Sequence, residues 1–163
     1  MNRSVTLTVV TALLLAALPA AASAMDDHMG VQAKALKWGP APPGLPPGAQ
    51  VAVVSGDPGK AEPYVVRAKM PKGYRIPPHT HPTDENVTVL SGTFHIAGGG
   101  TFDMKKGDAV TAGGFFRAAQ GMQHYGWVSE PTVIQIHGIG PFEITYVNPN
   151  DDPRNKSTAS TKK

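Results

Sequence analysis

The sequence contains no cysteine, and this absence removes two common devices of exported proteins. No disulfide can form, and no cysteine is available for attachment to a lipid. Charged residues are also scarce, at 17% of the chain, whereas hydrophobic residues make up 40%. This balance is typical of a globular protein that is stabilised by packing, and 163 residues are enough for one domain.

Neither sign of charge is in large excess. Arg3 is the only basic residue of the first 24, so 14 of the 15 basic residues remain beyond it, against 12 acidic residues. Four of the remaining basic residues fall in the last ten positions, namely Arg154, Lys156, Lys162 and Lys163. We therefore expect no nucleic-acid partner.

Long helical patterns are absent after residue 36, because glycine or proline interrupts nearly every window of ten residues. Residues 50–147 instead contain short β-type runs separated by turn residues, such as QVAVVSG, ENVTVLSG and TVIQIHG. Regular runs of this kind predict an all-β fold, an antiparallel sandwich or barrel in a single domain.

The segments on either side of residues 50–147 differ from them in composition. A stretch with five prolines and three glycines in thirteen positions, 38–50, covers the end of residues 25–49 and predicts that they form an extended arm. Residues 148–163 carry no large apolar side chain, which predicts a disordered tail. The arm could cover an edge of its own sheet or pair with a partner's sheet, so a homodimer stays open.

Residues 1–24 have the pattern of a secretory signal peptide. Arg3 precedes an apolar run from Val5 to Leu18, and Ala22-Ser23-Ala24 provides a small-residue cleavage site. A membrane anchor is the alternative, but the run is shorter than the roughly 20 residues that a spanning helix needs. We expect cleavage near Ala24 and a periplasmic or secreted protein with no membrane association afterwards.

Polar residues that can bind metals gather in GYRIPPHTHPTDENVTVLSG, residues 73–92. Because side chains alternate along a strand, His79 and His81 face the same side. Pro82, Thr83 and Asp84 form a predicted turn, after which Glu85 begins the next strand and can approach the same point. The strand then ends at Gly92, where a tight hairpin is expected.

His124 is a fourth candidate, because it follows the predicted turn at Gly121 and starts another β-type run. Three imidazoles and one carboxylate suit one divalent transition metal, Fe, Mn, Co, Ni, Cu or Zn, far better than Mg or Ca. Four such ligands leave two positions of an octahedral ion open for water, substrate or dioxygen. The alternative is a set of ordinary surface or packed polar residues.

Residues 73–92 resemble the cupin superfamily, whose first motif G-x5-H-x-H-x3-E-x6-G is matched in full from Gly73 to Gly92. The second motif, G-x5-P-x-G-x2-H-x3-N, is matched in part by Gly113, Gly121 and His124. Ala119 replaces its proline and Val128 replaces its asparagine. These changes remove a turn residue and a polar neighbour of the site, but no ligand.

The resemblance implies a cupin-type double-stranded β-barrel, a jelly roll, over residues 50–147. It also implies that His79, His81, Glu85 and His124 are the metal ligands, and that a dimer is a frequent assembly. It implies no settled reaction.

Several neighbouring residues are expected to have other roles. His95 is a lone strand histidine and is excluded from the site. Either Gln135 and His137 or the alternating residues Ile134 and Ile136 face the barrel interior. Aromatic and methionine residues near the second motif are expected to be core residues, namely Phe115, Phe116, Met122, Tyr125 and Trp127, and a pocket wall of Phe94, Phe102 and Met104 is a further hypothesis.

The function that these residues favour is binding of a small molecule at an open mononuclear metal site, with dioxygenase-type chemistry as one expectation. Glu85 is the candidate catalytic residue, since it can stay a ligand or detach to accept a proton. The alternative is a non-enzymatic protein that binds or senses a metal or small ligand. A metal-free isomerase is disfavoured, because all four ligands are retained.

Overall fold

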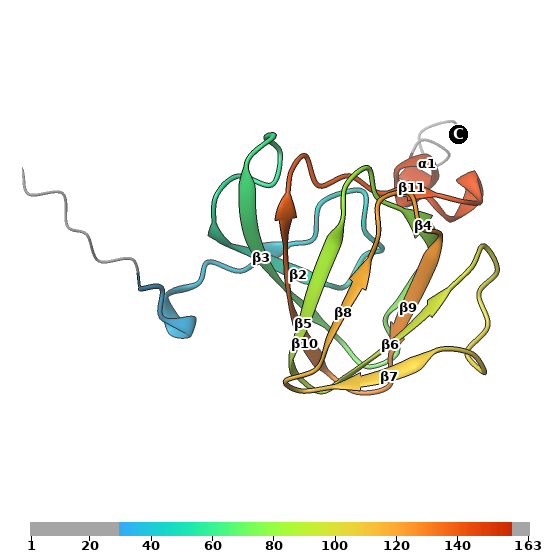
Figure 1. Ribbon diagram of the computed structural model, residues 1–163, viewed down its shortest axis with the longest axis horizontal. Coiled ribbons are helices and arrows are strands. Elements are labelled where there is room, and N and C mark those ends of the chain that lie inside the picture. The colour runs from blue at the N-terminus through green and yellow to red at the C-terminus, as the bar shows by residue number, and fades with distance from the viewer. Residues whose placement is uncertain (1–29, 158–163) are drawn as a thin grey trace, which may run out of the picture. The chain divides into compact units, whose positions relative to one another are not determined.

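The computed structural model describes residues 30–157, and it confirms the predicted all-β, jelly-roll fold (Figure 1). The strands form two antiparallel sheets, one with the order β1-β2-β3-β10-β5-β8 and one with the order β11-β4-β9-β6-β7. Their bounds are β1 (Gly39–Pro40), β2 (Gln50–Ser55), β3 (Pro63–Met70), β4 (Arg75–Thr80), β5 (Glu85–Ser91), β6 (Thr93–Gly98), β7 (Asp108–Thr111), β8 (Phe115–Ala118), β9 (His124–Val128), β10 (Thr132–Ile139) and β11 (Thr145–Tyr146).

The central strands alternate in burial, as strands with one face on a core must. In β5, Glu85, Val87 and Val89 are buried, whereas the residues between them are only partly covered. Strand β9 differs, because all five of its residues are buried. Its inner face carries His124, while Tyr125 and Trp127 on the outer face pack in a second cluster with Phe102.

The main core lies between the two sheets and is lined by side chains from both of them. The buried members include Val66 on β3, Val89 on β5, Phe94 on β6 and Ile134 on β10. This core supplies the packing that the absence of disulfides requires. It also surrounds the buried polar residues of the candidate site.

The Pro/Gly-rich arm belongs to the described residues from residue 30 onward. It contains a 3-10 helix, η1 (Ala33–Ala35), and β1, which pairs with the start of β2. The arm therefore lies on the edge of its own sheet, the first of the two arrangements expected from the sequence. Residues 1–24, the predicted signal peptide, fall outside the described residues.

The structure differs from the predicted disordered tail at residues 149–157. This segment forms a 3-10 helix, η2 (Pro149–Asp151), and a short α-helix, α1 (Pro153–Ser157). Polar contacts rather than apolar ones hold it. Asn148 caps η2 through the backbone N–H of Asn150, and the Arg154 guanidinium donates to the carbonyl of Ile144 at 3.0 Å. The prediction rested on the lack of apolar side chains, and composition does not reveal polar contacts of this kind.

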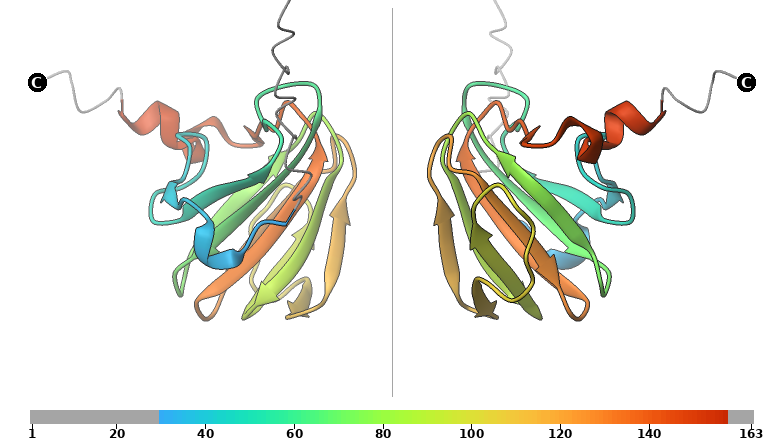
Figure 2. Two further views of the ribbon diagram at one scale, coloured as in Figure 1. Left: turned by 90° about the vertical axis from the view of Figure 1, so that its left-hand side faces the viewer. Right: turned by 90° about the vertical axis from the view of Figure 1, so that its right-hand side faces the viewer.

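Figure 2 shows both helices beside the segment that leads into β2.

Among residues 30–157, none of the helices is long and apolar enough to cross a membrane.

Candidate metal centre

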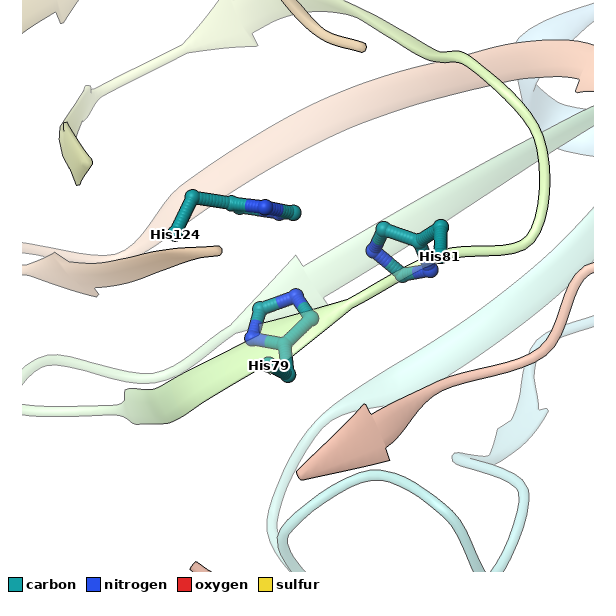
Figure 3. A group of neighbouring side chains, drawn as sticks. All are labelled: His79, His81 and His124. Atoms are coloured by element: carbon teal, nitrogen blue, oxygen red, sulfur yellow. The ribbon is translucent and has the colours of Figure 1, made fainter. Parts of the chain in front are cut away.

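Strands β4, β5 and β9 bring the four predicted site residues together. His79 lies on β4 directly opposite His124 on β9, and their ring centroids are 4.2 Å apart. His81 follows β4 by one residue, and Glu85 is the first residue of β5, as the turn between them predicts. All four side chains are buried, with exposed fractions of 2–8%. Figure 3 shows the three imidazoles around a common point.

Each imidazole is oriented by one backbone carbonyl. The Nδ1–H groups donate to the carbonyls of Pro77 for His79, Glu143 for His81 and Met122 for His124, at 2.7, 2.6 and 3.0 Å. Since a carbonyl can only accept, Nδ1 must carry the proton, and the Nε2 lone pair of each neutral ring is left free. A hydrogen bond of this kind typically fixes the tautomer of a metal-binding histidine.

The Nε2 atoms of His81 and His124 are buried and have no hydrogen-bond partner within the described part of the chain. An unpaired buried nitrogen is costly, so a site with two of them calls for a group that accepts their lone pairs. One ring nitrogen from each of His79, His81 and His124 lies within 4.8 Å of the others. This group could hold a metal ion.

Glu85 supplies a carboxylate beside two of the three rings. Its Oε2 atom lies 3.3 Å from Nε2 of His124 and 3.5 Å from Nε2 of His81. These separations are longer than the 2.7–2.9 Å typical of a charge-assisted hydrogen bond. They are close to the spacing of about 3 Å expected for two ligands that each lie about 2.1 Å from one ion. The Glu85 carboxylate therefore lies at ligand-to-ligand spacing from two rings of the histidine group that could hold a metal.

The pKa values of His79 and Glu85 favour the protonation states that metal binding needs, whereas the raised pKa of His81 makes metal binding there compete with a proton. Burial and the neighbouring rings of His124 and His81 together lower the pKa of His79 to about 3, so this ring is neutral. Burial raises the pKa of Glu85, but the contacts with His124 and His81 outweigh it, and the net pKa is lowered. For His81, burial lowers the pKa, while Glu85 raises it and prevails.

The four residues border a small apolar cavity of ≈ 30 Å³. A cavity of this size holds about two waters, or an ion with a small ligand. Its walls come from both sheets and are almost entirely apolar, including Met70, Ile76, Val87, Phe94, Ile134 and Ile136. Charges and dipoles inside such a cavity are weakly screened.

Strand β8 and the loop that follows it fix the turn that carries His81 and Glu85. Asp84, between these two residues, accepts hydrogen bonds from Arg117 at 2.7 and 3.0 Å and from the backbone N–H of Gln120 at 2.9 Å. The N–H of Gly121 donates to the carbonyl of His81. The turn of the first motif and the loop before His124 are thereby joined.

Gln135 and His137 do not line the cavity; Ile134 and Ile136 do. On the outer face, Gln135 accepts a hydrogen bond from Arg67 at 3.0 Å, and His137 lies near Phe115. The burial of the two isoleucines resolves the choice that the alternating pattern left open.

The hypothesised apolar wall is correct for Phe94 only. Phe102 packs on Tyr125 and Trp127 outside the cavity, and Met104 is exposed. The assignment of Phe115 and Met122 to the core is also wrong, because they are 55% and 42% exposed.

Tyr125 and Trp127 are buried as expected, and Phe116 is half-buried against the main core. His95 stacks on Trp127, away from the cavity. The exclusion of His95 from the site, expected because it is a single histidine on its strand, is therefore confirmed.

Sequence reasoning missed the carbonyl acceptors and the residues that close the cavity. Leu45 of the arm, with Phe142 and Ile144 before β11, borders the cavity beside the histidines. Backbone acceptors leave no side-chain pattern, so no sequence signal could have found them. The Phe-Glu-Ile run at 142–144 was visible, but its place depends on the path of the chain after β10.

This fold and the buried histidine group together place the protein in the cupin superfamily. Within that superfamily, residues 26–143 match the family model of the ChrR cupin-like domain. The match spans most of the chain, and the protein therefore belongs to this family.

Solved structures show the same fold. The polyketide cyclase RemF from Streptomyces resistomycificus is 17% identical, with a TM-score of 0.61 over 79% of this chain and 92% of that one. An acetylacetone dioxygenase from Acinetobacter johnsonii is 11% identical, with a TM-score of 0.57 over 100% of both chains. An RmlC-like cupin from Shewanella frigidimarina is 16% identical, with a TM-score of 0.53 over 66% and 86%. No curated protein matches the sequence.

Proposed function

We propose that this protein is exported to the periplasm or secreted, and that it binds one divalent transition metal through His79, His81, His124 and Glu85. A small molecule then binds beside the ion, with dioxygenase-type chemistry as the reaction. One observation carries the metal-binding part of this proposal: three buried imidazoles, each with Nδ1–H held by a carbonyl, direct free Nε2 lone pairs toward one cavity beside a carboxylate.

The donor set favours a borderline metal. Three neutral nitrogens and one carboxylate oxygen suit Fe, Mn, Co, Ni, Cu or Zn, whereas Mg and Ca prefer oxygen ligands. When bound, such an ion supplies Lewis-acid polarisation of a substrate or, with Fe, activation of dioxygen. The chain itself fixes the imidazoles, surrounds the site with apolar walls and holds Glu85 where it can accept a proton from a bound substrate.

The cavity limits the substrate. Because the enclosed volume is ≈ 30 Å³, only a few atoms of a ligand can enter it beside an ion. A small diketone, phenol or thiol has a polar head of this size. The acetylacetone dioxygenase of the same fold supports diketones as the first class to examine.

The same small volume favours one alternative, a non-enzymatic protein that holds or senses a metal or a small ligand. A site with little room beside the ion is suited to complete coordination, as structural metal sites are. The two functions differ in whether a small molecule can displace a ligand or water from the ion.

Oxygen uptake by the Fe(II)-loaded protein separates these functions. We expect consumption of dioxygen that depends on at least one small diketone, phenol or thiol, and we expect it to be lost in Glu85→Ala. The measurement uses an oxygen electrode, with Zn(II)-loaded protein as the redox-inactive control. Fe(II)-loaded protein that stays inert with all three classes would leave the binding function and exclude the oxygenase.

A further inference from the structure

We propose that small ligands reach the metal cavity through the gap between β7 and β8, and that Phe116 is the gate residue that sets their size. This inference rests on the proposed metal site. Strands β7 and β8 are the edge strands of different sheets, so no backbone ladder joins them in the described part of the chain. The barrel is therefore open along this line.

A groove of ≈ 330 Å³ lies at this gap and meets the cavity. Three residues border both spaces, namely Ile96, Phe116 and His124. The other residues that line the groove do not border the cavity, and they include Lys106, Asp108 and Met122. The groove and the cavity are therefore neighbours that share these three residues, one of which is the proposed metal ligand His124.

Phe116 forms the movable part of the boundary that the groove and the cavity share. It lies opposite Val87 in the β5–β8 register and is only half-buried, and its ring stacks on Phe94 with centroids 5.3 Å apart. An apolar ring makes no hydrogen bond, so its rotation breaks only apolar packing against the main core, including the stacking on Phe94. Side-chain rotations of this kind are fast compared with movements of backbone segments.

The other side of the cavity is closed by backbone segments. A second groove, of ≈ 420 Å³, shares Leu45, Phe142 and Ile144 with the cavity. Hydroxyl groups of Tyr74 and Tyr146 donate to the carbonyls of Pro46 and Gly44, at 2.6 and 2.9 Å.

The segment before β11 is held in the same way. Arg154 donates to the carbonyl of Ile144, and His81 donates to that of Glu143. Opening here would break the bond that orients a metal ligand. Opening the cavity at Phe116 thus requires only a ring rotation. Opening it at the arm or at the segment before β11 would require several hydrogen bonds to break.

The gate predicts the class of ligand. With Phe116 closed, the metal cavity admits species of a few non-hydrogen atoms, such as dioxygen, azide or the head of a diketone. Any larger part of the molecule would lie in the groove between β7 and β8. Removal of the ring should speed entry and admit bulkier heads, while a larger residue at Met122 should slow entry without touching the cavity.

Azide binding to the Co(II)-loaded protein tests this directly, since the visible absorption of Co(II) responds to a new ligand. In stopped-flow measurements, Phe116→Ala is expected to raise the association rate about tenfold, and Met122→Trp to lower it several-fold. Tyr146→Phe, which releases the arm from its hydrogen bond, is the matched control and should change the rate less than about twofold.

Two results would overturn the inference while leaving the metal site intact. One is a larger acceleration in Tyr146→Phe than in Phe116→Ala, which would place the entrance at the arm. The other is an azide rate that no Phe116 or Met122 variant changes. A cooperative thermal unfolding transition establishes that each variant is folded. If Phe116→Ala does not fold, Phe116→Leu takes its place. A chain that binds no Co(II) would overturn the proposed function itself, and the titration shows this before any rate is measured.

Discussion

His124→Ala is expected to lower metal affinity more than 100-fold, because it removes one of three imidazoles and leaves Glu85 with one histidine neighbour instead of two. Loss of a residue that hydrogen-bonds to a metal ligand typically lowers metal affinity 10–100-fold. Loss of the ligand itself should lower the affinity further. The measurement is competition with a chromogenic chelator, for one metal at a time.

His137→Ala is the matched control for that experiment. Like His124, His137 lies on a strand, but it is on the outer face of β10 and borders no part of the metal cavity. Its removal should leave metal affinity unchanged. Equal losses in the two variants would show that histidines bind metal adventitiously and would contradict the proposed site.

Gly92→Ala is expected to lower the free energy of unfolding by about 3 kcal/mol, because both backbone strain and a clash act at this position. Gly92 has φ +75° between β5 and β6, a region that costs other residues roughly 1–2 kcal/mol. A Cβ atom there would lie 2.6 Å from the carbonyl oxygen of Pro131, which belongs to the backbone and cannot move aside alone. Urea unfolding measures the loss.

Gly73 provides the comparison, since it is the other end glycine of the same motif and also has a positive φ, +81°. A Cβ atom at Gly73 would meet nothing within 4 Å. Gly73→Ala should therefore cost only the strain, roughly 1–2 kcal/mol. If both variants lost the same stability, the clash at Gly92 would have no energetic role.

The sequence predicted most of the fold because its signals are local. Alternating residues and turn glycines mark β5 and its hairpin, and the two-residue spacing of His79 and His81 requires a common face. Glu85 could be placed because a proline and an aspartate between it and His81 indicate a turn. His124 was harder to place, since its position opposite His79 depends on strands that pair across the whole sheet.

What could not be predicted depends on contacts between distant segments. The carbonyl of Glu143, which orients His81, lies 62 residues away in the chain. Arg154 looks like a tail residue until the structure shows it at the carbonyl of Ile144. Phe115 is exposed because it lies on the outer face of the edge strand β8, and Met122 is exposed in the loop between β8 and β9.

Elemental analysis tests the central claim most directly. The protein would be purified without a metal-affinity tag, beside the double variant His79→Ala, His81→Ala. We expect close to one Fe, Mn, Co, Ni, Cu or Zn per chain in the parent protein, and none in the double variant. Absence of metal from the parent protein, even after reconstitution with each of these ions, would contradict the metal site and leave a cupin barrel that acts through its cavity alone.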